Sequence, residues 1–525
     1  MLPGRGGYEG LDTLIAWDGG LTLLAPLVAI ALALITRKVI PSLAAGVVVG
    51  ALVATQADFL LAANRLAAFS YAIVTAADKI LICLFSLLVA ATVGVMGRAG
   101  GTRALVKKVE VIAKGRRGAM TSSWLAGAIV FFDDYANCLV VGSAMGPVVD
   151  RFRVSRAKLA YIVDATAAPV ASLALISTWV GYEVSMIADN MPIADANGFN
   201  IFLNALPYRF YCILTLFFVG AIALTGRDFG PMLKAEQEAV ARPPEPEPGS
   251  ERNPRPTYVS IAAIPIAVLV VGTFGLMLHA GYMELGAMAG PFSLIAAVQD
   301  PYPPMFYGSL ASFVIACAMA VGTRSLDIKE TWKGAWGGMK VVLSALAILF
   351  FAWLLSDVIK DTNARQFIAS GLAGHIDPWM LPALTFLLAC ATAFATGSSF
   401  STMGVLIPIV IPLAYEMDGG TTGYVFLASC AAVLDGAVLG DHASPISDTT
   451  VLSSIGANVD VVTHVRTQLP YVIAVGVVAI LVGAIPAGLG ITPWILLPVG
   501  GAACVGIVLV LGKRTPDAPL ERAEA

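Results

Sequence analysis

Charged residues are scarce in this sequence: Asp, Glu, Lys and Arg make up only 13% of its 525 residues, whereas 58% are hydrophobic. Soluble domains carry about 25% charged residues, so the composition excludes an ordinary soluble fold. The apolar runs are about 18–25 residues long, which is the length that crosses ~30 Å of hydrocarbon. The net charge of −3 is spread between these runs and gives no basic face for nucleic acid. We therefore predict an all-α polytopic membrane protein whose surrounding partner is the lipid bilayer.

Several motif classes are also missing. The seven cysteines show no Cys-x-x-Cys spacing, so the sequence predicts neither a metal centre nor a disulfide framework. No P-loop, His-Glu-x-x-His or Gly-x-Ser-x-Gly pattern occurs, which leaves ATP-driven pumping and the matching hydrolase chemistries without support. We expect a protein that is not an enzyme and that needs no cofactor.

The basic residues predict how the first half crosses the membrane. Two basic clusters, within residues 98–117 and 151–158, flank the apolar stretch Ala119–Val149. A single helix needs only about 20 residues and would place one cluster outside. A re-entrant hairpin with its tip at residues 131–137 keeps both clusters on the cytoplasmic side. We expect the acidic segment Tyr182–Asn200 to be an external loop.

The second half repeats this scheme with opposite sidedness. Acidic residues flank the apolar stretch Trp379–Tyr415, which predicts a second hairpin with its tip at residues 395–402. We expect a broken helix near Pro169 and another near Pro445, because proline removes a helix hydrogen bond. The fold prediction is two inverted-topology repeats, each with a re-entrant hairpin and a broken transmembrane helix, and about 11 full spans in total, with a binding site near the midplane.

The repeats divide the chain into residues 1–226 and 258–490. The Pro-rich, charged segment 227–257 between them is expected to be an extended cytoplasmic linker. Residues 491–525 add one more transmembrane helix and a cytoplasmic tail. This arrangement predicts a multi-pass protein of the cell membrane with its N-terminus outside.

Polar residues in the predicted hairpins and helix breaks are candidates for a cation and proton site. A charge at this depth costs at least ~2.5–3.5 kcal/mol, so it indicates function. Carboxylate and hydroxyl oxygens are ligands of hard cations. The six aspartates are Asp133, Asp134, Asp164, Asp435, Asp441 and Asp448. The predicted neutral ligands are Asn137, Thr166, Ser398, Ser399, Thr402, Ser444, Ser447 and Thr449. The alternative for each aspartate is a loop carboxylate that faces water, and for Asp435 a helix cap.

Two histidines and the missing basic residues add to this prediction. His442 follows Asp441 and could sense pH, because histidine titrates near neutrality; the open alternative is that it holds the helix break by hydrogen bonds. His464 is expected to be an interface residue at the end of a span. No Arg or Lys lies in the predicted tips or breaks, which favours a cation over an organic anion as substrate.

Three segments resemble a known family. They are Gly440-Asp-His-Ala-Ser-Pro-Ile-Ser-Asp-Thr-Thr-Val-Leu-Ser-Ser454, Phe132-Asp-Asp-Tyr-Ala-Asn-Cys-Leu-Val-Val-Gly142 and Thr396-Gly-Ser-Ser-Phe-Ser-Thr-Met-Gly404. These segments resemble the NhaC family of sodium/proton antiporters, and the similarity spans essentially the whole chain. The resemblance implies a homodimer that exchanges Na⁺ or Li⁺ for H⁺ by alternating access, with Na⁺ carried by Asp133, Asp134, Asp441 and Asp448.

Two alternatives stay open. Relatives with this pattern include malate/lactate exchangers, so the chain could be a Na⁺- or H⁺-coupled exchanger of small organic acids or of cationic amino acids. Leu439-Gly440-Asp441 also resembles the Gly-Asp element of intramembrane aspartyl proteases. The inverted repeats, the two hairpins and the hydroxyl-rich surroundings argue against a protease.

Overall fold

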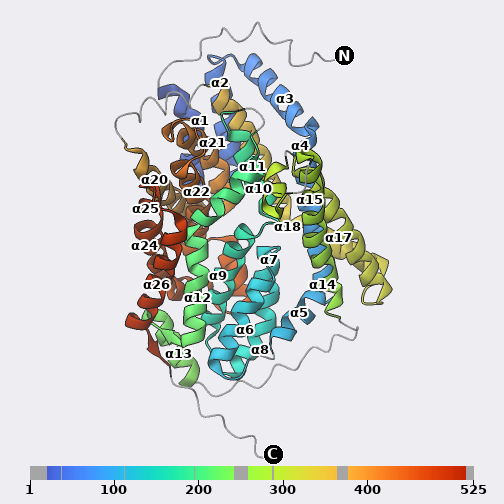
Figure 1. Cartoon of the computed structure of the whole chain (residues 1–525), viewed down its shortest axis with the longest axis vertical. Helices are drawn as coiled ribbons and strands as arrows, with labels where there is room; N and C mark the ends of the chain where they lie inside the picture. Colours follow the sequence, from blue (N-terminus) through green and yellow to red (C-terminus); the bar gives the residue numbers. More distant parts are fainter. Residues whose placement is uncertain are drawn as a thin grey trace, which may run out of the picture.

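The computed structural model describes residues 20–36, 38–110, 113–193, 196–241, 258–286, 289–298, 300–362 and 376–515 (Figure 1). In these ranges nine helices are long and apolar enough to cross a membrane. A tenth span results if Gly198–Tyr208 and Phe210–Thr225, which meet at a 47° bend, cross together. Three shorter apolar helices include two of the predicted spans. The prediction of an all-α polytopic membrane protein is confirmed, and the inverted symmetry of its halves stays a prediction.

In the described ranges up to residue 241, the chain contains thirteen α-helices and one short strand. Their bounds are α1 (Leu24–Thr36, after the turn Gly20–Leu23), α2 (Val39–Ala54), α3 (Phe59–Thr75), α4 (Ala77–Arg98), α5 (Gly101–Glu110), α6 (Arg116–Ile129), α7 (Asp134–Ala136, followed by the π-helical turn Asn137–Val141), α8 (Gly142–Arg151), α9 (Arg156–Leu173), α10 (Val180–Asn190), α11 (Gly198–Ala205, followed by the turn Leu206–Tyr208), α12 (Phe210–Thr225), β1 (Arg227–Asp228) and α13 (Gly230–Ala241).

The second half is built from longer helices. Their bounds are α14 (Ser260–Ala267, continued by the π-helical turn Val268–Gly272), α15 (Thr273–Leu285), α16 (Pro291–Ala297), α17 (Tyr302–Gly322), α18 (Ile328–Asp361), α20 (Leu381–Thr396, after the turn Pro378–Met380), α21 (Ser399–Met417), α22 (Tyr424–Ala443), α23 (Asp448–Ala457), α24 (Val461–Val478, continued by the π-helical turn Ala479–Ala484), α25 (Ile485–Gly488), α26 (Pro493–Leu511) and β2 (Lys513–Arg514).

Both predicted hairpins turn back at their predicted tips. Helices α6 and α8 pack against each other, and the short helix α7 lies at the turn between them (Figure 1). Helices α20 and α21 also pack together, and Gly397 joins them with φ +66°, a left-handed conformation that suits glycine. The helix break predicted at Pro445 lies between α22 and α23.

The break predicted near Pro169 is in the wrong place. Helix α9 continues through Pro169 to Leu173, and the irregular segment follows at residues 174–179. Proline removes one helix hydrogen bond, but tight packing on both sides can hold the helix together, and Pro169 is buried here.

Two predicted loops are also more ordered than expected. Arg227 and Asp228 pair with Arg514 and Lys513 in an antiparallel strand pair, and residues 230–241 form α13 instead of an extended linker. Residues 242–257 lie outside the described ranges. Glu183, predicted in an external loop, is buried within α10.

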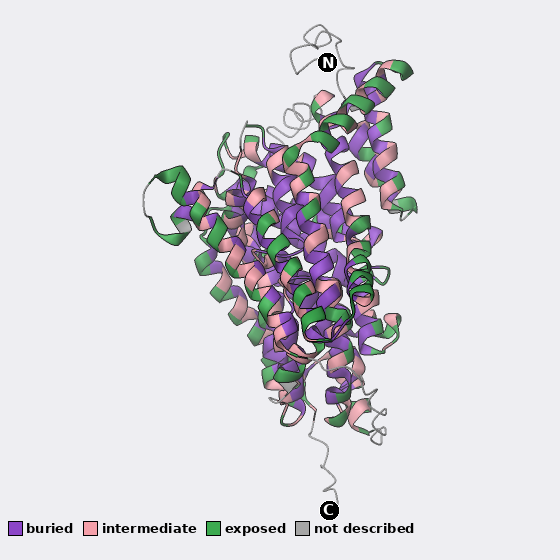
Figure 2. Ribbon diagram, turned by 90° about the vertical axis from the view of Figure 1, so that its right-hand side faces the viewer, coloured by how far each residue is buried: buried purple, intermediate pink, exposed green. Residues whose placement is uncertain are grey.

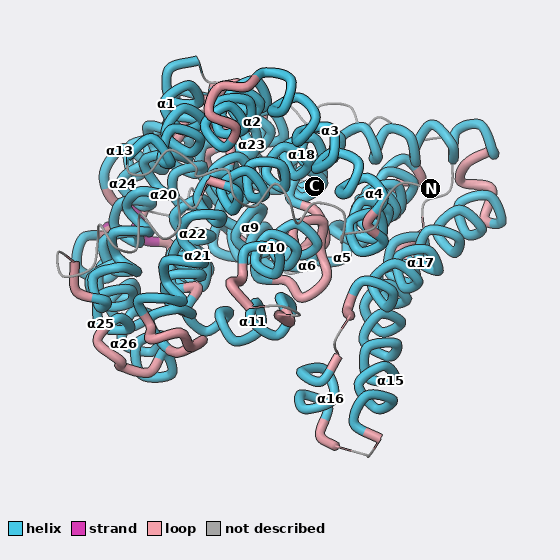
Figure 3. Tube along the Cα trace, turned by 90° about the horizontal axis from the view of Figure 1, so that it is seen from above, coloured by secondary structure: helices cyan, strands magenta, loops and turns pink. Residues whose placement is uncertain are grey.

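The helices form one main bundle with a side arm. Buried residues concentrate along its middle, while exposed residues cover the periphery (Figure 2). Seen from above, α15, α16 and α17 stand apart from the bundle (Figure 3). Helix α17 joins this arm to the rest by packing along α4. Helices α9 and α22, which carry three of the six predicted aspartates, lie inside the main bundle.

Candidate ion-binding site

The interruption between α22 and α23 is fixed by its own hydroxyl residues. Ser444 ends α22 and donates a 2.8 Å hydrogen bond to the carbonyl of Phe394. Ser447 begins α23 by accepting a hydrogen bond from the Thr450 backbone N–H. A Cβ on Gly397 would lie 2.7 Å from the carbonyl oxygen of Ile446, so the second hairpin tip packs directly on this interruption. The break is therefore a supported feature of the bundle and positions the side chains beside it.

Asp441 and Asp448 lie on the two sides of this break. The Thr449 hydroxyl donates to Asp441 Oδ2 at 2.7 Å and lies 3.1 Å from the Ser447 hydroxyl. The other oxygen, Asp441 Oδ1, is buried without a hydrogen-bond partner among the described residues. Asp448 is exposed, and its Oδ2 accepts a hydrogen bond from the Tyr135 hydroxyl of the first hairpin tip. The break thus joins the two halves of the chain through acidic groups.

The Asp164 carboxylate, on α9, is surrounded by four polar side chains. Its Oδ2 accepts hydrogen bonds of 3.0 Å from both the Thr450 hydroxyl and the Gln468 amide. Its Oδ1 accepts from the Ser453 hydroxyl at 3.4 Å, and His464 Nε2 lies 3.8 Å from Oδ2. All of these groups are buried. Asp164 therefore sits in a polar pocket made by α9, α23 and α24.

Asn137 closes the first hairpin tip. Its amide nitrogen donates to the carbonyls of Gly127 at 2.7 Å, Val130 at 3.2 Å and Thr166 at 2.9 Å. These bonds tie both arms of the hairpin to α9. In the described part of the chain its Oδ1 atom is buried with no donor. The side chain therefore has a structural role through its nitrogen and an oxygen left over for a ligand.

The aspartates at this tip do different things. Asp133 caps α7 by accepting a 2.7 Å hydrogen bond from the Ala136 backbone N–H. Asp134 is buried, and its Oδ2 has no hydrogen-bond partner within the described ranges. Asp134 lines a small cavity of about 20 Å³ together with Tyr135, Tyr182 and Phe400. A water molecule needs about 10–15 Å³, so this cavity has room for one water-sized occupant.

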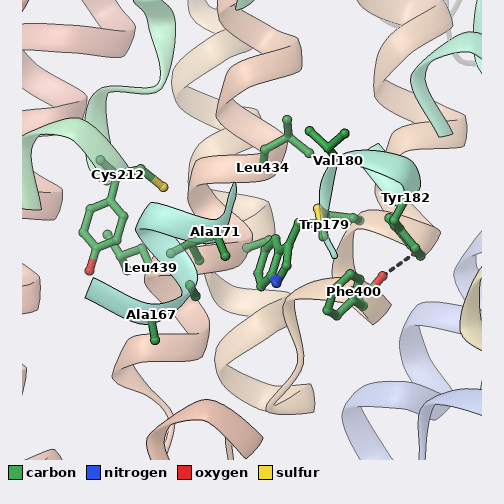
Figure 4. Close-up of a cluster of buried hydrophobic side chains, with 14 of the residues drawn as sticks. Ala167, Ala171, Trp179, Val180, Tyr182, Cys212, Phe400, Leu434 and Leu439 are labelled. Atoms are coloured by element: carbon green, nitrogen blue, oxygen red, sulfur yellow. Dashed lines mark hydrogen bonds between the residues drawn. The ribbon is translucent and has the colours of Figure 1, made fainter. Parts of the chain in front are cut away.

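Aromatic side chains form one wall of this cavity. Figure 4 shows the Tyr182 hydroxyl pointing to the backbone of Phe400, and this hydrogen bond is 2.6 Å long. The Trp179 and Phe400 rings lie 4.7 Å apart, and those of Tyr182 and Phe400 5.1 Å apart. The rings join α10 to the second hairpin, so both hairpin tips meet at the cavity.

Several predicted ligands use their side-chain hydroxyls to donate hydrogen bonds to backbone carbonyls. The Thr166 hydroxyl donates to the Ile162 carbonyl at 2.7 Å. Ser399 donates to the Ala437 carbonyl at 3.2 Å, and Thr402 to the Ser398 carbonyl at 3.1 Å. Ser398 itself caps α21. These hydroxyls hold helix ends and hairpins in place, so their role is to support the site, and other groups contact Asp164 and Asp441.

Asp435 belongs to a different group of side chains. Its Oδ1 accepts from Arg209 Nε at 2.8 Å, and its Oδ2 accepts from the Tyr211 backbone N–H at 2.6 Å. Of the six predicted aspartates, Asp435 is the one that the structure pairs with a buried arginine.

His442 is held by both ring nitrogens. Nε2 lies 2.9 Å from the Asp164 carbonyl oxygen, so Nε2 must carry the hydrogen. Nδ1 then accepts from the Tyr211 hydroxyl at 3.0 Å. Neutral His442 is fully satisfied by these two contacts, which favour the positioning role over the pH-sensing role. The sensing role stays a prediction.

Sequence reasoning missed His464 and Gln468 as site residues. The sequence predicts His464 as an interface residue at the end of a span, whereas α24 begins at Val461 and contains both residues. Both missed residues are buried on α24 beside Asp164. Their spacing of four residues places them on one helix face, and Asp460 caps this helix by accepting from the Thr463 N–H. That cap was the signal that could have extended the helix.

The electrostatic balance of the site is unusual for buried carboxylates. Over the described ranges no Lys or Arg side chain makes an ion pair with Asp134, Asp164, Asp441 or Asp448. In the same part of the chain no three His, Cys, Asp or Glu side chains converge well enough to hold a metal ion. A small cation here would draw on hydroxyl and carbonyl oxygens as well as carboxylates, and protons could serve the same need.

Comparison with known proteins agrees with this chemistry. The Na⁺/H⁺ antiporter family matches residues 170–486, more than half of the chain. An uncharacterized protein of Haemophilus influenzae is 33% identical over 86% of this chain and 87% of its own length. The arginine/ornithine antiporter ArcD of Halobacterium salinarum is 32% identical over 30% of this chain and 31% of its own. The Na⁺/H⁺ antiporter NhaC of Alkalihalophilus pseudofirmus is 27% identical over 34% of this chain and 36% of its own.

The fold is similar to that of a solved transporter. The YdaH transporter of Alcanivorax borkumensis superposes with a TM-score of 0.54 at 16% identity, over 79% of this chain and 90% of its own. At this identity the likeness concerns the fold alone. The resemblance to the NhaC family is confirmed by the family match, which covers two of the three segments, residues 396–404 and 440–454. The chain is an antiporter and belongs to the Na⁺/H⁺ antiporter family.

Proposed function

We propose that this antiporter exchanges Na⁺ for H⁺ by alternating access, with Asp134, Asp164, Asp441 and Asp448 as shared carriers. The observation that carries the proposal is the pair of buried carboxylate oxygens, Asp134 Oδ2 and Asp441 Oδ1, which have no hydrogen-bond donor in the described ranges. An ionised carboxylate in this setting is strongly destabilised unless a charge or a proton neutralises it. A bound cation and a bound proton do this equally well, so each can replace the other.

The size of the Asp134 cavity supports a small cargo. Its volume of about 20 Å³ accepts a water-sized ion and leaves no room for malate or lactate in this conformation. The oxygens that line it belong to the Asp134 carboxylate and to hydroxyl groups, which are ligands of hard cations. Asp448 is exposed while the other three carboxylates are buried, so it is the carrier through which ions and protons enter or leave.

The test is transport by the purified protein in sealed vesicles with an imposed pH difference. Added Na⁺ should collapse the pH difference, and Asp448→Asn should abolish this effect. Asp460→Asn is a matched control, because Asp460 caps α24 and its side chain bonds only Thr463. Full exchange by the Asp448→Asn protein would remove Asp448 from the carriers. Absence of any Na⁺-dependent change in wild-type vesicles would overturn the proposal.

A second candidate is exchange of an organic cation such as a cationic amino acid. The observation in its favour is that Asp134 shares its cavity with the rings of Tyr135, Tyr182 and Phe400. This candidate requires the cavity to widen in another conformation, because about 20 Å³ does not hold an amino acid. A carboxylate beside aromatic faces is a setting that attracts ammonium and guanidinium groups, and one relative bears the name of an arginine/ornithine antiporter. Uptake of labelled lysine into the same vesicles tests this candidate, and labelled malate and lactate test the organic-acid alternative.

We also propose that β1, β2 and α13 lie on the cytoplasmic side. The strand pair brings Arg227 together with Lys513 and Arg514, and short segments rich in basic residues stay inside. Labelling of an introduced cysteine at Lys513 from one side of the membrane tests this orientation. The homodimer stays a prediction from the family resemblance.

A further inference from the structure

A second group of buried charges lies beside the ion-binding site. Arg209 is fully buried at the start of α12 and faces two carboxylates. Its Nε donates to Asp435 Oδ1 at 2.8 Å, whereas its Nη1 lies 3.6 Å from Glu183 Oε1. The Ser172 hydroxyl donates to the same Glu183 oxygen at 2.8 Å and also accepts from Arg209. The group joins α9, α10, α12 and α22.

One guanidinium cannot neutralise two buried carboxylates. Asp435 is the better-held partner, because two donors contact it at 2.8 and 2.6 Å. Glu183 has the longer ion pair, and its Oε2 is buried without a hydrogen-bond partner in the described part of the chain. A second uncompensated negative charge in this position would be costly. The neutral, protonated form of Glu183 relieves that cost.

The group that neutralises the Glu183 carboxylate is a proton and not a metal cation. The charged or titratable groups that act on this carboxylate are Arg209 at the start of α12, and Asp435 and Cys430 of α22. The guanidinium repels a metal cation at this distance, because two like charges a few ångström apart interact strongly in a low-dielectric interior. Among the described residues, no Lys or Arg forms an ion pair with Asp164, Asp441 or Asp448.

Hydrogen bonds connect the two groups of charges. The Tyr211 backbone N–H donates to Asp435 at 2.6 Å, and the Tyr211 hydroxyl contacts His442 Nδ1 at 3.0 Å. His442 Nε2 donates in turn to the backbone carbonyl of Asp164 at 2.9 Å. A change of charge at Glu183 can therefore shift Arg209, Asp435 and Tyr211, and through them His442 at the ion-binding site. Figure 4 shows the apolar side chains that surround this region, including Cys212 and Leu434.

We propose that Glu183, paired with Arg209 beside Asp435, is a proton-binding site separate from the cation site. This inference rests on the proposed exchange of Na⁺ for H⁺, because it names a proton carrier for that exchange. The proton comes from water that reaches the site in one conformation and returns to water in the other. Asp435 stays ionised and keeps Arg209 in place.

Infrared difference spectroscopy on the whole purified protein tests this proposal directly. A protonated carboxyl group gives its own C=O stretching band, and the band of Glu183 should disappear when the pH is raised. The Glu183→Gln variant should lack this band and still bind radioactive Na⁺. Glu236→Gln is the matched control, because Glu236 is equally buried but is paired with Arg116 and accepts from the Ser155 N–H. This control should keep the band.

If Glu183→Gln does not fold, a second variant tests the proposal. Ser172→Ala removes the hydroxyl that donates to Glu183 and should shift the frequency of the same band. A band unchanged in both variants overturns the proton site. If wild-type vesicles exchange no Na⁺ for H⁺ but the Glu183 band is present, the proposed function fails and the proton site stands. If exchange is present and Glu183→Gln exchanges with unchanged pH dependence, the proton site is wrong.

Discussion

Asp228 and Asp164 are both buried carboxylates, but different groups hold them. Asp228 accepts from the Lys158 ammonium group and, at 2.7 Å, from the Tyr471 hydroxyl. Nearby, Glu236 is paired with Arg116, so an ion pair fastens α13 to the first hairpin. Asp164 has only hydroxyl and amide donors at hydrogen-bond distance, with His464 at 3.8 Å.

This difference separates structural charges from functional ones. When both members of an ion pair belong to the protein, their charges neutralise each other and no ion from solution is needed. Removal of one member leaves the other as a buried, unpaired charge. A carboxylate without a basic partner must be neutralised by something that the protein does not itself contain. The first arrangement suits the end of the bundle near β1 and β2, and the second suits a carrier site.

The largest effect is expected at Asp164, the proposed carrier. Asp164→Asn should reduce Na⁺-dependent proton flux in vesicles to the level of protein-free vesicles. The amide keeps the shape but cannot bind a cation as a charge or exchange a proton. Thermal unfolding should show a stability equal to or above wild type, because no buried partner loses its counter-charge. Flux near the wild-type rate would place Asp164 outside the carrier set.

The opposite result is expected at Asp228. Asp228→Asn leaves Lys158 buried and uncompensated, which should destabilise the protein by about 3–5 kcal/mol. Denaturation of the detergent-solubilised protein measures this loss. The remaining folded protein should bind Na⁺ with wild-type affinity. A normal stability together with lost Na⁺ binding would contradict the division between the two groups.

A smaller effect is expected from the hydroxyls around Asp164. Thr450→Val removes a donor to Asp164 Oδ2, and a hydrogen bond to a charged group is worth about 1.5–3 kcal/mol. The proton should then compete better, so apparent Na⁺ affinity at neutral pH should fall about tenfold or more. Thr166→Val is the matched control, because that hydroxyl bonds only carbonyls of its own helix. Equal effects of the two variants would contradict the assignment.

The smallest effect is expected at His442. Both of its ring nitrogens are satisfied in the neutral form. His442→Gln should therefore lower the exchange rate a little and leave the shape of its pH profile unchanged. A clear displacement of the pH profile would instead support the pH-sensing prediction.

The sequence predicted the helical membrane fold, both hairpin turns and the break at Pro445, because long apolar runs and polar interruptions are visible without contacts. It misplaced the break near Pro169, since a buried proline within packed helices does not have to end a helix. Residues 230–241 were predicted as linker because their charged composition does not reveal a helix that one ion pair, between Glu236 and Arg116, fastens to a distant part of the chain.

At the site, sequence patterns gave the residue types but not their partners. Asp441 and Asp448 lie at the predicted break near Pro445, whereas Asp164 joins them from the uninterrupted helix α9. The pairing of Asp435 with Arg209 joins residues far apart in the chain, and no local pattern signals it. Glu183, His464 and Gln468 were missed for the same reason: their importance depends on which helices pack together.

The central claim is that Na⁺ and protons compete for the same carboxylates. Equilibrium binding of radioactive Na⁺ to the purified protein, measured at a series of pH values, tests it most directly. Apparent affinity should fall steadily as the pH is lowered, and Asp164→Asn should abolish the binding. Tight Na⁺ binding that does not change with pH, or that survives in Asp164→Asn, would contradict the claim.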